Sequence, residues 1–281
     1  MKIAISAEST IDLPKNLLEK FDIHVLPLYV RLGQEEFLDG TINQQKIFDY
    51  VKETKQLPKT SAQNIQNYQD FFEGLLKDYD AVIHFAISSK ISSSYQNAFK
   101  AAENMENVFV MDTLSLSTGI ALLAISARKL ANTTTLSAKE IFEETLKRRE
   151  HNQTSFILLE LNYLFKGGRC SSLQYFGSNL LKIKPQIVME NGAMHSGKKF
   201  MGNSDASYIK YVNATLEEYN TPDLENVFIT YTTCKDEIVE EIKEILVKRG
   251  FKNVYVTRAG ATITSYCGEG CLGILYFNDG K

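Results

Sequence analysis

The sequence predicts an α/β protein with two domains, a parallel-sheet α/β domain followed by an α+β domain. Strand-like and helix-like segments alternate over the first half of the 281-residue chain, which is typical of a parallel sheet covered by helices. Near residue 154 the alternation ends, and strands are then mixed with two long amphipathic helices. We therefore expect an N-terminal domain over residues 1–152 and a C-terminal domain over residues 153–281.

The elements of the N-terminal domain follow from apolar runs and apolar spacing. Short apolar runs predict strands, and apolar residues recurring every three to four positions predict helices. The predicted strands are Ile3–Ser6, His24–Leu32, Ala81–Ile87 and Val108–Met111. The predicted helices are Leu13–Phe21, Ile42–Thr54, Asn64–Lys77, Ser93–Asn104, Leu116–Asn132 and Ser137–Glu150, the last opened by a capping box between Ser137 and Glu140.

The C-terminal domain is predicted in the same way. Its strands are Ser155–Leu159, Gln186–Glu190, Val227–Thr232, Val254–Thr257 and Leu272–Phe277, and its helices lie near Asp205–Tyr219 and Asp236–Arg249. The pair Asn191-Gly192 after the second strand is a strong signal for a hairpin turn.

Composition and charge exclude several classes of function. The net charge is −3 and the lysines and arginines are scattered, so we expect no nucleic-acid surface. No apolar run approaches the roughly 18 residues of a membrane span, and the first residues lack a secretory pattern. We expect a cytoplasmic protein with reduced thiols. Cys267 and Cys271 lack further ligands nearby and are interpreted as packing residues, so no metal or cofactor is predicted.

Hydroxyl side chains cluster where predicted strands end. The run Ser88–Tyr95 directly follows the strand Ala81–Ile87 and leads into a helix, and such a junction directs backbone N–H and Oγ donors at one point. In doubly wound sheets, ligands bind at the carboxyl ends of the strands. Each hydroxyl group alone fits helix capping, but together they predict a site for a ligand with a small anionic head and a neutral body. The other clusters are Ser6, Ser9 and Thr10, then Thr60 and Ser61, and finally Thr113, Ser115, Ser117 and Thr118.

Two catalytic alternatives stay open at this stage. Gly192–Lys198 matches part of a phosphate-binding loop, which would suit a phosphotransferase, although Lys199 replaces the expected magnesium-binding hydroxyl. A hydrolase could use one serine of the run at Ser88, although no G-x-S-x-G elbow is present. His84 lies inside an apolar strand and is interpreted as a core residue instead of a base.

Lys166-Gly167-Gly168-Arg169 is a further distinctive segment. Two glycines permit a tight turn with positive φ, after which Arg169 can lie across the domain interface. Gly167, Gly168 and Arg169 are therefore predicted to organise the cleft. A turn with an arginine that only binds neighbouring carbonyl groups explains the segment equally well.

Taken in order, these motifs resemble the DegV family of bacterial fatty-acid-binding proteins over nearly the whole chain. The matching segments are Glu8-Ser9 with Asp12-Leu13-Pro14, Thr60-Ser61, Ser88–Tyr95, Leu161–Arg169, Lys184-Pro185 and Gly268–Gly273. The resemblance implies two α/β domains with one long-chain fatty acid buried between them. It implies that the hydroxyls of Thr60 or Ser61 and of Ser92 bind the carboxylate, and that the protein itself has no catalytic residue.

The resemblance also shows where this chain departs from the family. Tyr266 stands where the family usually has histidine, and a phenol keeps its proton over the pH range in which an imidazole titrates. Ser93 replaces a glycine and places another hydroxyl beside the head group. The resemblance implies that the protein presents its fatty acid to a separate kinase subunit, as the best-understood members do, and that this subunit makes acyl phosphate for phospholipid synthesis. Phe200 stands where an arginine implicated in kinase docking is usual, which argues against that partner and leaves open a regulatory or scaffolding role.

Overall fold

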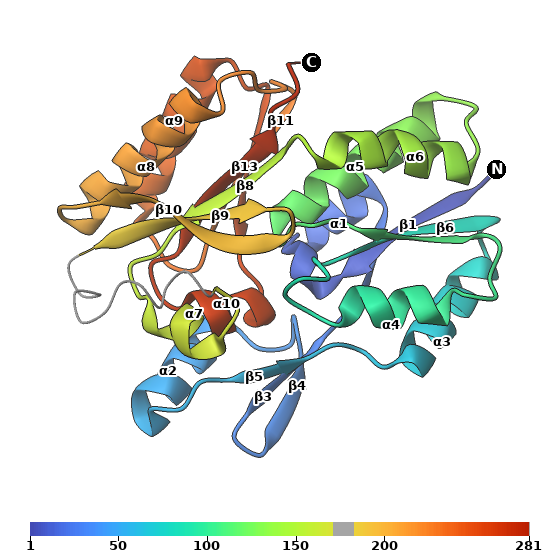
Figure 1. Ribbon diagram of the computed structural model, residues 1–281, viewed down its shortest axis with the longest axis horizontal. Helices are drawn as coiled ribbons and strands as arrows, with labels where there is room; N and C mark the ends of the chain where they lie inside the picture. Colours follow the sequence, from blue (N-terminus) through green and yellow to red (C-terminus); the bar gives the residue numbers. More distant parts are fainter. Residues whose placement is uncertain (171–182, 281) are drawn as a thin grey trace.

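The computed structural model describes residues 1–170 and 183–280, and these residues contain three β-sheets (Figure 1). The first sheet has the order β2-β1-β6-β7, and all its strand pairs are parallel. Its strands are β1 (Ile3–Glu8), β2 (Ile23–Leu26), β6 (Ala81–Ala86) and β7 (Val108–Asp112). The predicted parallel sheet of the N-terminal half is thus confirmed.

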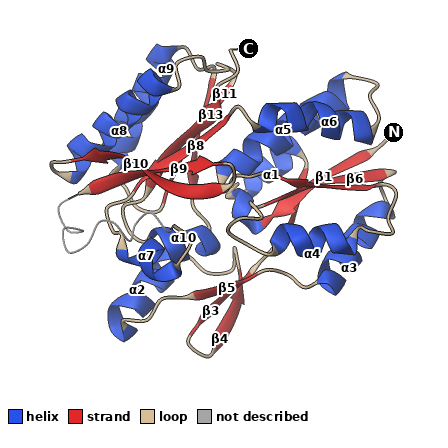
Figure 2. Cartoon of the chain, in the orientation of Figure 1, coloured by secondary structure: helices blue, strands red, loops and turns tan. Residues whose placement is uncertain are grey.

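Helices cover both faces of this sheet, as Figure 2 shows. One face carries α3 (Ile65–Leu76) and α4 (Ser94–Ala101), and the other carries α5 (Thr118–Thr133) and α6 (Ala138–Arg149). Alternate strand residues point to opposite faces, so Ala4 and Val82 pack toward α3 and α4. Ile5 and Ile83 pack into the core on the other face. Burial on both faces explains why these strands are apolar throughout. A short helix α1 (Lys15–Phe21) follows β1.

The second sheet has six strands in the order β10-β9-β8-β13-β11-β12, antiparallel except between β11 and β12. Helices α8 (Ser204–Glu218) and α9 (Asp236–Arg249) pack with it through a core that includes Ile157, Ile229 and Ile274. The strands are β8 (Asn152–Ile157), β9 (Lys184–Glu190), β10 (Ala193–Phe200), β11 (Asn226–Tyr231), β12 (Asn253–Arg258) and β13 (Leu272–Phe277).

Helix α5 lies between the two large sheets and contacts strands of both. One hydrophobic cluster therefore runs from Ile5 of the first sheet through Leu123 of α5 to Phe228 and Leu275 of the second. The second sheet begins at β8, close to the expected boundary between residues 152 and 153. Treating the two parts as separate domains stays a prediction.

The single strand predicted over His24–Leu32 is wrong, because the chain changes sheets at Pro27. Proline has no N–H to donate to a strand ladder, and β2 ends just before it. The chain resumes as β3 (Tyr29–Leu32), which belongs to a small antiparallel sheet of order β4-β3-β5. Its neighbours β4 (Glu35–Leu38) and β5 (Lys59–Ser61) were not predicted, and α2 (Gln44–Thr54) lies between them in sequence.

The sequence analysis also missed two short helices and one strand, and one of these helices contributes side chains to the candidate site. Strand β10 follows the predicted Asn191-Gly192 turn, while α7 (Asn162–Gly167) and α10 (Ala261–Cys267) are too short for a clear helical periodicity. Helix α10 packs against α2, α7, β3, β5 and the short 3-10 turn Ser9–Ile11, designated η1 (Figure 1). It thereby carries residues of the C-terminal half into contact with the N-terminal half.

Candidate ligand-binding cavity

A cavity of about 340 Å³ lies where elements from both halves of the chain meet. Its wall combines aliphatic and aromatic side chains from β-strand ends, loops and α10 with a group of hydroxyls. The apolar part includes Leu28, Ile87, Leu116, Phe156, Leu164 and Ile263, and the hydroxyl part includes Thr10, Thr60, Ser61, Ser92, Ser93, Thr262 and Tyr266. An apolar pocket with a few convergent polar groups is typical of small-molecule sites.

The structure brings all the hydroxyl residues predicted for ligand binding to this one wall. Thr60 and Ser61 come from β5, Ser92 and Ser93 from the loop before α4, and Tyr266 from α10. Thr60 Oγ1 and the Tyr266 phenol oxygen are 2.9 Å apart and share a hydrogen bond. This bond joins residues 206 positions apart in the sequence. Their role in holding a carboxylate stays a prediction.

Within the Lys166–Arg169 segment, Arg169 lines the cavity, and the two glycines before it act differently. Gly168 ends α7 with φ of 68°, in the left-handed region that favours glycine. Gly167 belongs to the helix, and a Cβ there would lie 2.6 Å from Cδ1 of Tyr266. Glycine is therefore needed at position 167 for the close approach of the Tyr266 ring. The Arg169 guanidinium lies 4.9 Å from that ring's centre, lines the cavity and is exposed to solvent.

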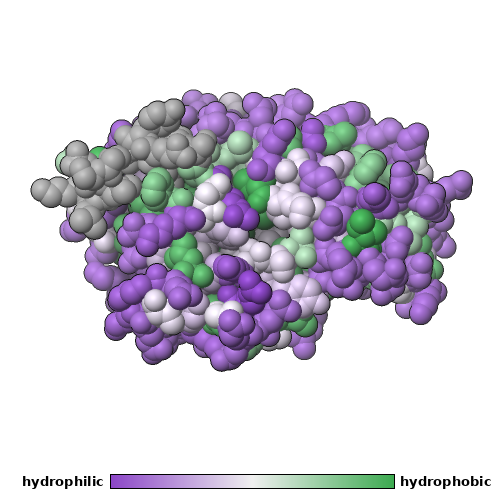
Figure 3. Space-filling model, turned by 60° about the horizontal axis from the view of Figure 1, so that its bottom comes forward, coloured by the Kyte–Doolittle hydropathy of each residue, from purple (hydrophilic) through white to green (hydrophobic). Residues whose placement is uncertain are grey.

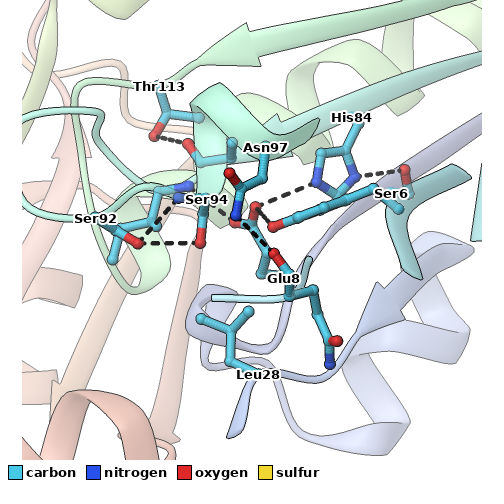
Figure 4. Close-up of polar contacts among 12 residues, drawn as sticks. Ser6, Glu8, Leu28, His84, Ser92, Ser94, Asn97 and Thr113 are labelled. Atoms are coloured by element: carbon cyan, nitrogen blue, oxygen red, sulfur yellow. Dashed lines mark hydrogen bonds and ion pairs between the residues drawn. The ribbon is translucent and has the colours of Figure 1, made fainter. Parts of the chain in front are cut away.

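The serine run divides into residues with separate roles (Figure 4). Ser88 is buried and its Oγ donates to the carbonyl of Gly192, tying the run to the β9–β10 turn. Ser92 Oγ donates to Ser94 Oγ at 3.0 Å and accepts from the Ser94 N–H. Ser93 is exposed at the N-cap of α4, and its side chain makes no capping bond. The run therefore turns the chain and also leaves Ser92 and Ser93 on the cavity wall.

A fully buried polar network that includes Glu8, His84 and Ser6 lies beside Ser92 and Ser94 (Figure 4). Glu8 Oε2 accepts from the N–H of Ile87, and its Oε1 accepts from the Tyr68 hydroxyl at 2.8 Å. Burial raises the pKa of Tyr68 well above its usual value, so the phenol keeps the proton that it donates. His84 Nε2 lies 3.3 Å from the same carboxylate, and its Nδ1 contacts Ser6 Oγ. His84 is thus a core residue with polar partners, as expected from the sequence.

Thr10 and Thr262 were absent from the predicted set, yet both line the cavity. Among the described residues, neither side-chain oxygen has a hydrogen-bond partner, although both side chains are buried. Thr10 belonged to the hydroxyl cluster after the first strand, which was a usable signal. Thr262 lies on α10, which the sequence did not predict, so nothing indicated that this residue would line the cavity.

The phosphate-loop alternative lacks its structural basis. Gly192 has φ of 82° in the turn between β9 and β10, and residues 193–200 form a strand where the motif requires a helix. Cys267 and Cys271 are buried, and burial raises the pKa of Cys271, which favours a packing role. No group of three potential metal ligands occurs within residues 1–170 and 183–280. Phe200 is buried against Tyr211 and presents no polar group at the surface.

One face of the molecule shows white and green residues gathered near its centre, framed by hydrophilic residues (Figure 3).

Among the helices that the structure describes, none combines the length and apolar character needed to cross a membrane.

Comparison with known proteins assigns the chain to a family. A family model described as "Uncharacterised protein, DegV family" matches residues 2–279. The chain is 29% identical to Protein DegV of Bacillus subtilis, over 98% of this chain and 99% of that one. It is equally 29% identical to a protein of Thermotoga maritima named "Fatty acid-binding protein", over 97% and 96% of the two chains.

Solved structures agree with this assignment. A DegV family protein from Thermus thermophilus, described as binding fatty acid, superposes with a TM-score of 0.90 at 26% identity and covers 99% of both chains. The structure of Bacillus subtilis DegV, described as a fatty acid binding protein, gives a TM-score of 0.85 at 27% identity over 99% of both chains. The predicted α/β fold and the resemblance are both confirmed, and the chain belongs to the DegV family.

Proposed function

We propose that this protein binds a long-chain fatty acid in the cavity, with the acyl chain against the apolar wall and the carboxylate at the hydroxyls. The observation that carries the proposal is the composition of the cavity wall, where an apolar lining meets Thr60, Ser61, Ser92, Ser93 and Tyr266. Relatives named as fatty acid-binding proteins support it.

The free energy gained by burying an acyl chain favours such a ligand. Burial of about 15 methylene groups at ~0.8 kcal/mol each gives roughly 12 kcal/mol of gross transfer free energy, before the costs of ordering and association. The acyl chain therefore supplies most of the affinity. The hydroxyls and the Arg169 guanidinium beside Tyr266 then fix the orientation of the ligand, because they hold its charged end at the polar end of the cavity.

The test has two parts. The purified protein is denatured and extracted with organic solvent, and the extract is examined by mass spectrometry for fatty acids. The delipidated protein is then titrated with palmitate by calorimetry, because the chain has no tryptophan to report binding. An extract free of fatty acid together with no palmitate binding overturns the proposal.

Variants locate the carboxylate. Thr60→Val and Ser92→Ala each remove a hydroxyl from the wall. We expect either to weaken palmitate binding about tenfold to hundredfold, which corresponds to the roughly 1.5–3 kcal/mol of one hydrogen bond to a charged group. Thr133→Val is the matched control, because Thr133 is exposed on α5 and outside the cavity lining. Equal affinities for all three variants would place the head group elsewhere.

We further propose that the bound carboxylate is presented to a kinase subunit. The polar end of the cavity supports this, because Ser61, Ser93 and Arg169 line it and are exposed. Phe200 is buried, so docking would have to use other side chains than the arginine usual at that position. Loaded protein, ATP, magnesium and a fatty acid kinase subunit should yield acyl phosphate, trapped by hydroxylamine as the hydroxamate.

Omission of either protein should abolish the hydroxamate, because the carrier is proposed to contribute no catalytic residue of its own. Product formed by this chain alone with ATP would instead support the phosphotransferase alternative. Tight palmitate binding without product in any combination would favour a regulatory or scaffolding role.

A further inference from the structure

A groove of about 570 Å³ adjoins the polar end of the cavity. Thr60, Arg169 and Tyr266 line both the cavity and the groove, so the two meet at the Thr60–Tyr266 hydrogen bond. The groove lies where β5, α7 and α10 come together, because α10 packs against the other two (Figure 1). Its wall also includes Lys59 of β5 and Lys166 of α7, both of them exposed. We call this hollow the basic groove.

Three cations line the basic groove, and none of its described lining residues is acidic. Neither Lys59 nor Lys166 has an ion-pair partner among residues 1–170 and 183–280. The Arg169 guanidinium contacts a backbone carbonyl and an aromatic ring, neither of which is charged. Other surface lysines of this chain do pair with a carboxylate, as Lys129 does with Glu225 at 2.6 Å. The neutral residues of the groove wall are Gln56, Leu57, Pro58, Thr60, Gly167, Ser265 and Tyr266.

The positions of the two lysines indicate an anion that extends beyond a carboxylate. Lys59 and Lys166 line the groove but not the cavity, whereas Arg169 lines both. A carboxylate held at the Thr60–Tyr266 pair carries one negative charge and has Arg169 beside it. The lysines therefore suit a further anionic group attached to the outer side of that carboxylate.

A phosphate group has the charge and the oxygens that such a groove can bind. A phosphate ester carries about −1.5 to −2 charges at pH 7 and has three strong acceptor oxygens. Lysine binds phosphate as a point charge, and arginine binds it through paired N–H donors. In the proposed kinase reaction a carboxylate oxygen attacks the γ-phosphorus of ATP, the bond to the ADP oxygen breaks and ADP leaves. The transferred phosphate is then attached to the carboxylate oxygen, next to the basic groove.

We propose that the basic groove binds the phosphate group of an acyl phosphate through Lys59, Lys166 and Arg169, so that the protein holds the acyl phosphate more tightly than the fatty acid. The inference rests on the proposed fatty-acid binding, which places the carboxylate at the Thr60–Tyr266 pair. One exposed charge contact changes an affinity about threefold, so the two lysines together should favour the phosphate-bearing ligand about tenfold. The protein would then retain the reactive mixed anhydride until an acyl-transfer reaction consumes it.

The experiment uses palmitate and the β-ketophosphonate analogue of palmitoyl phosphate, in which CH₂ replaces the bridging oxygen and prevents hydrolysis. Each ligand is titrated into delipidated protein by calorimetry. We expect the phosphonate to bind about tenfold more tightly than palmitate. The Lys59→Gln, Lys166→Gln double variant should lose this preference, while its palmitate affinity should fall no more than about threefold, because neither lysine lines the cavity.

A Lys100→Gln, Lys139→Gln double variant is the matched control. It removes the same charge from two exposed lysines outside both the cavity and the groove, and it should keep the preference for the phosphonate. Inorganic phosphate lacks the acyl chain, so it should compete with the phosphonate only at millimolar concentrations or above. Competition at the concentration of the phosphonate itself would indicate a site for free phosphate and overturn the inference.

Two further results would overturn the inference. One is equal binding of palmitate and the phosphonate to the unsubstituted protein, and the other is an undiminished preference in the Lys59→Gln, Lys166→Gln double variant. Failure of palmitate itself to bind would instead overturn the proposed function, so the two failures are distinguishable.

Discussion

Replacement of Gly167 by alanine tests how the cavity is built. The added Cβ would lie 2.6 Å from Cδ1 and 3.0 Å from Cε1 of Tyr266, whereas ordinary contacts begin at 3.4 Å. The ring must therefore retreat by roughly 1 Å, and overpacking of this kind costs about 1–3 kcal/mol. A shift of that size can carry the phenol out of hydrogen-bonding range of Thr60, since the two oxygens are now 2.9 Å apart.

We expect Gly167→Ala to weaken palmitate binding by about tenfold to hundredfold. The estimate takes one hydrogen bond to a charged group as about 1.5–3 kcal/mol. The gain in helix propensity, up to about 1 kcal/mol, offsets part of the strain in the unliganded protein. Calorimetric titration measures the affinity, and urea denaturation measures the free energy of unfolding.

Gly168→Ala is the matched control. Gly168 has φ of 68° and its Cβ would meet nothing within 4 Å, so alanine there adds backbone strain of about 1 kcal/mol but leaves Tyr266 in place. We expect Gly168→Ala to lower stability with little change in affinity. An unchanged affinity in Gly167→Ala, or an equal loss in both variants, would refute the reasoning that position 167 sets the place of the Tyr266 ring.

Three further outcomes are expected. Glu8→Gln should lower the free energy of unfolding by roughly 1–3 kcal/mol in urea denaturation, because an amide NH₂ would replace the oxygen that accepts from the Tyr68 hydroxyl or from the Ile87 N–H. An unchanged free energy of unfolding would contradict this prediction. Burial raises the pKa of Asp12, so the folded state holds that proton more tightly and stability falls as pH rises from about 4 through the folded value. Asp12→Asn should remove this decline, and parallel pH–stability curves would disprove it. Palmitate affinity should be nearly constant between about pH 5.5 and 8. In the Tyr266→His variant the affinity should fall with rising pH, because the imidazole loses its proton. A fall of tenfold or more in the unsubstituted protein would exclude Tyr266 as the head-group donor.

Long elements and caps were predictable because their signals are local. The capping box between Ser137 and Glu140 forms as expected, with Ser137 Oγ accepting from the Glu140 N–H and the Glu140 carboxylate accepting from the Ser137 N–H. Strand β13 matches its predicted bounds, because Leu272–Phe277 is an apolar run that is buried throughout. The break at Pro27 was readable as a proline effect, but which sheet each half joined depends on partners distant in sequence.

The candidate site was predicted only at positions where the residue type itself indicated a binding role. Thr60, Ser61, Ser92, Ser93 and Tyr266 came from hydroxyl clusters and from the resemblance, and all five lie on the cavity wall. Thr262 could not be found in the same way, because it lies on a helix of seven residues whose position depends on packing against α2, β3 and β5. The role of Gly167 was likewise hidden, since it depends on a ring 99 positions later in the chain.

The sequence by itself determined the α/β class, the parallel sheet, the hydroxyl-rich strand ends and the family, because periodicity, capping and ordered motifs are properties of neighbouring residues. Only the tertiary structure decided that α10 crosses to the N-terminal half, that Thr60 meets Tyr266, and that the Thr10 and Thr262 hydroxyls find no hydrogen-bond partner among the described residues. The physical reason is that burial and hydrogen-bond satisfaction depend on which distant segments exclude water from one another, and that is a property of the packed fold.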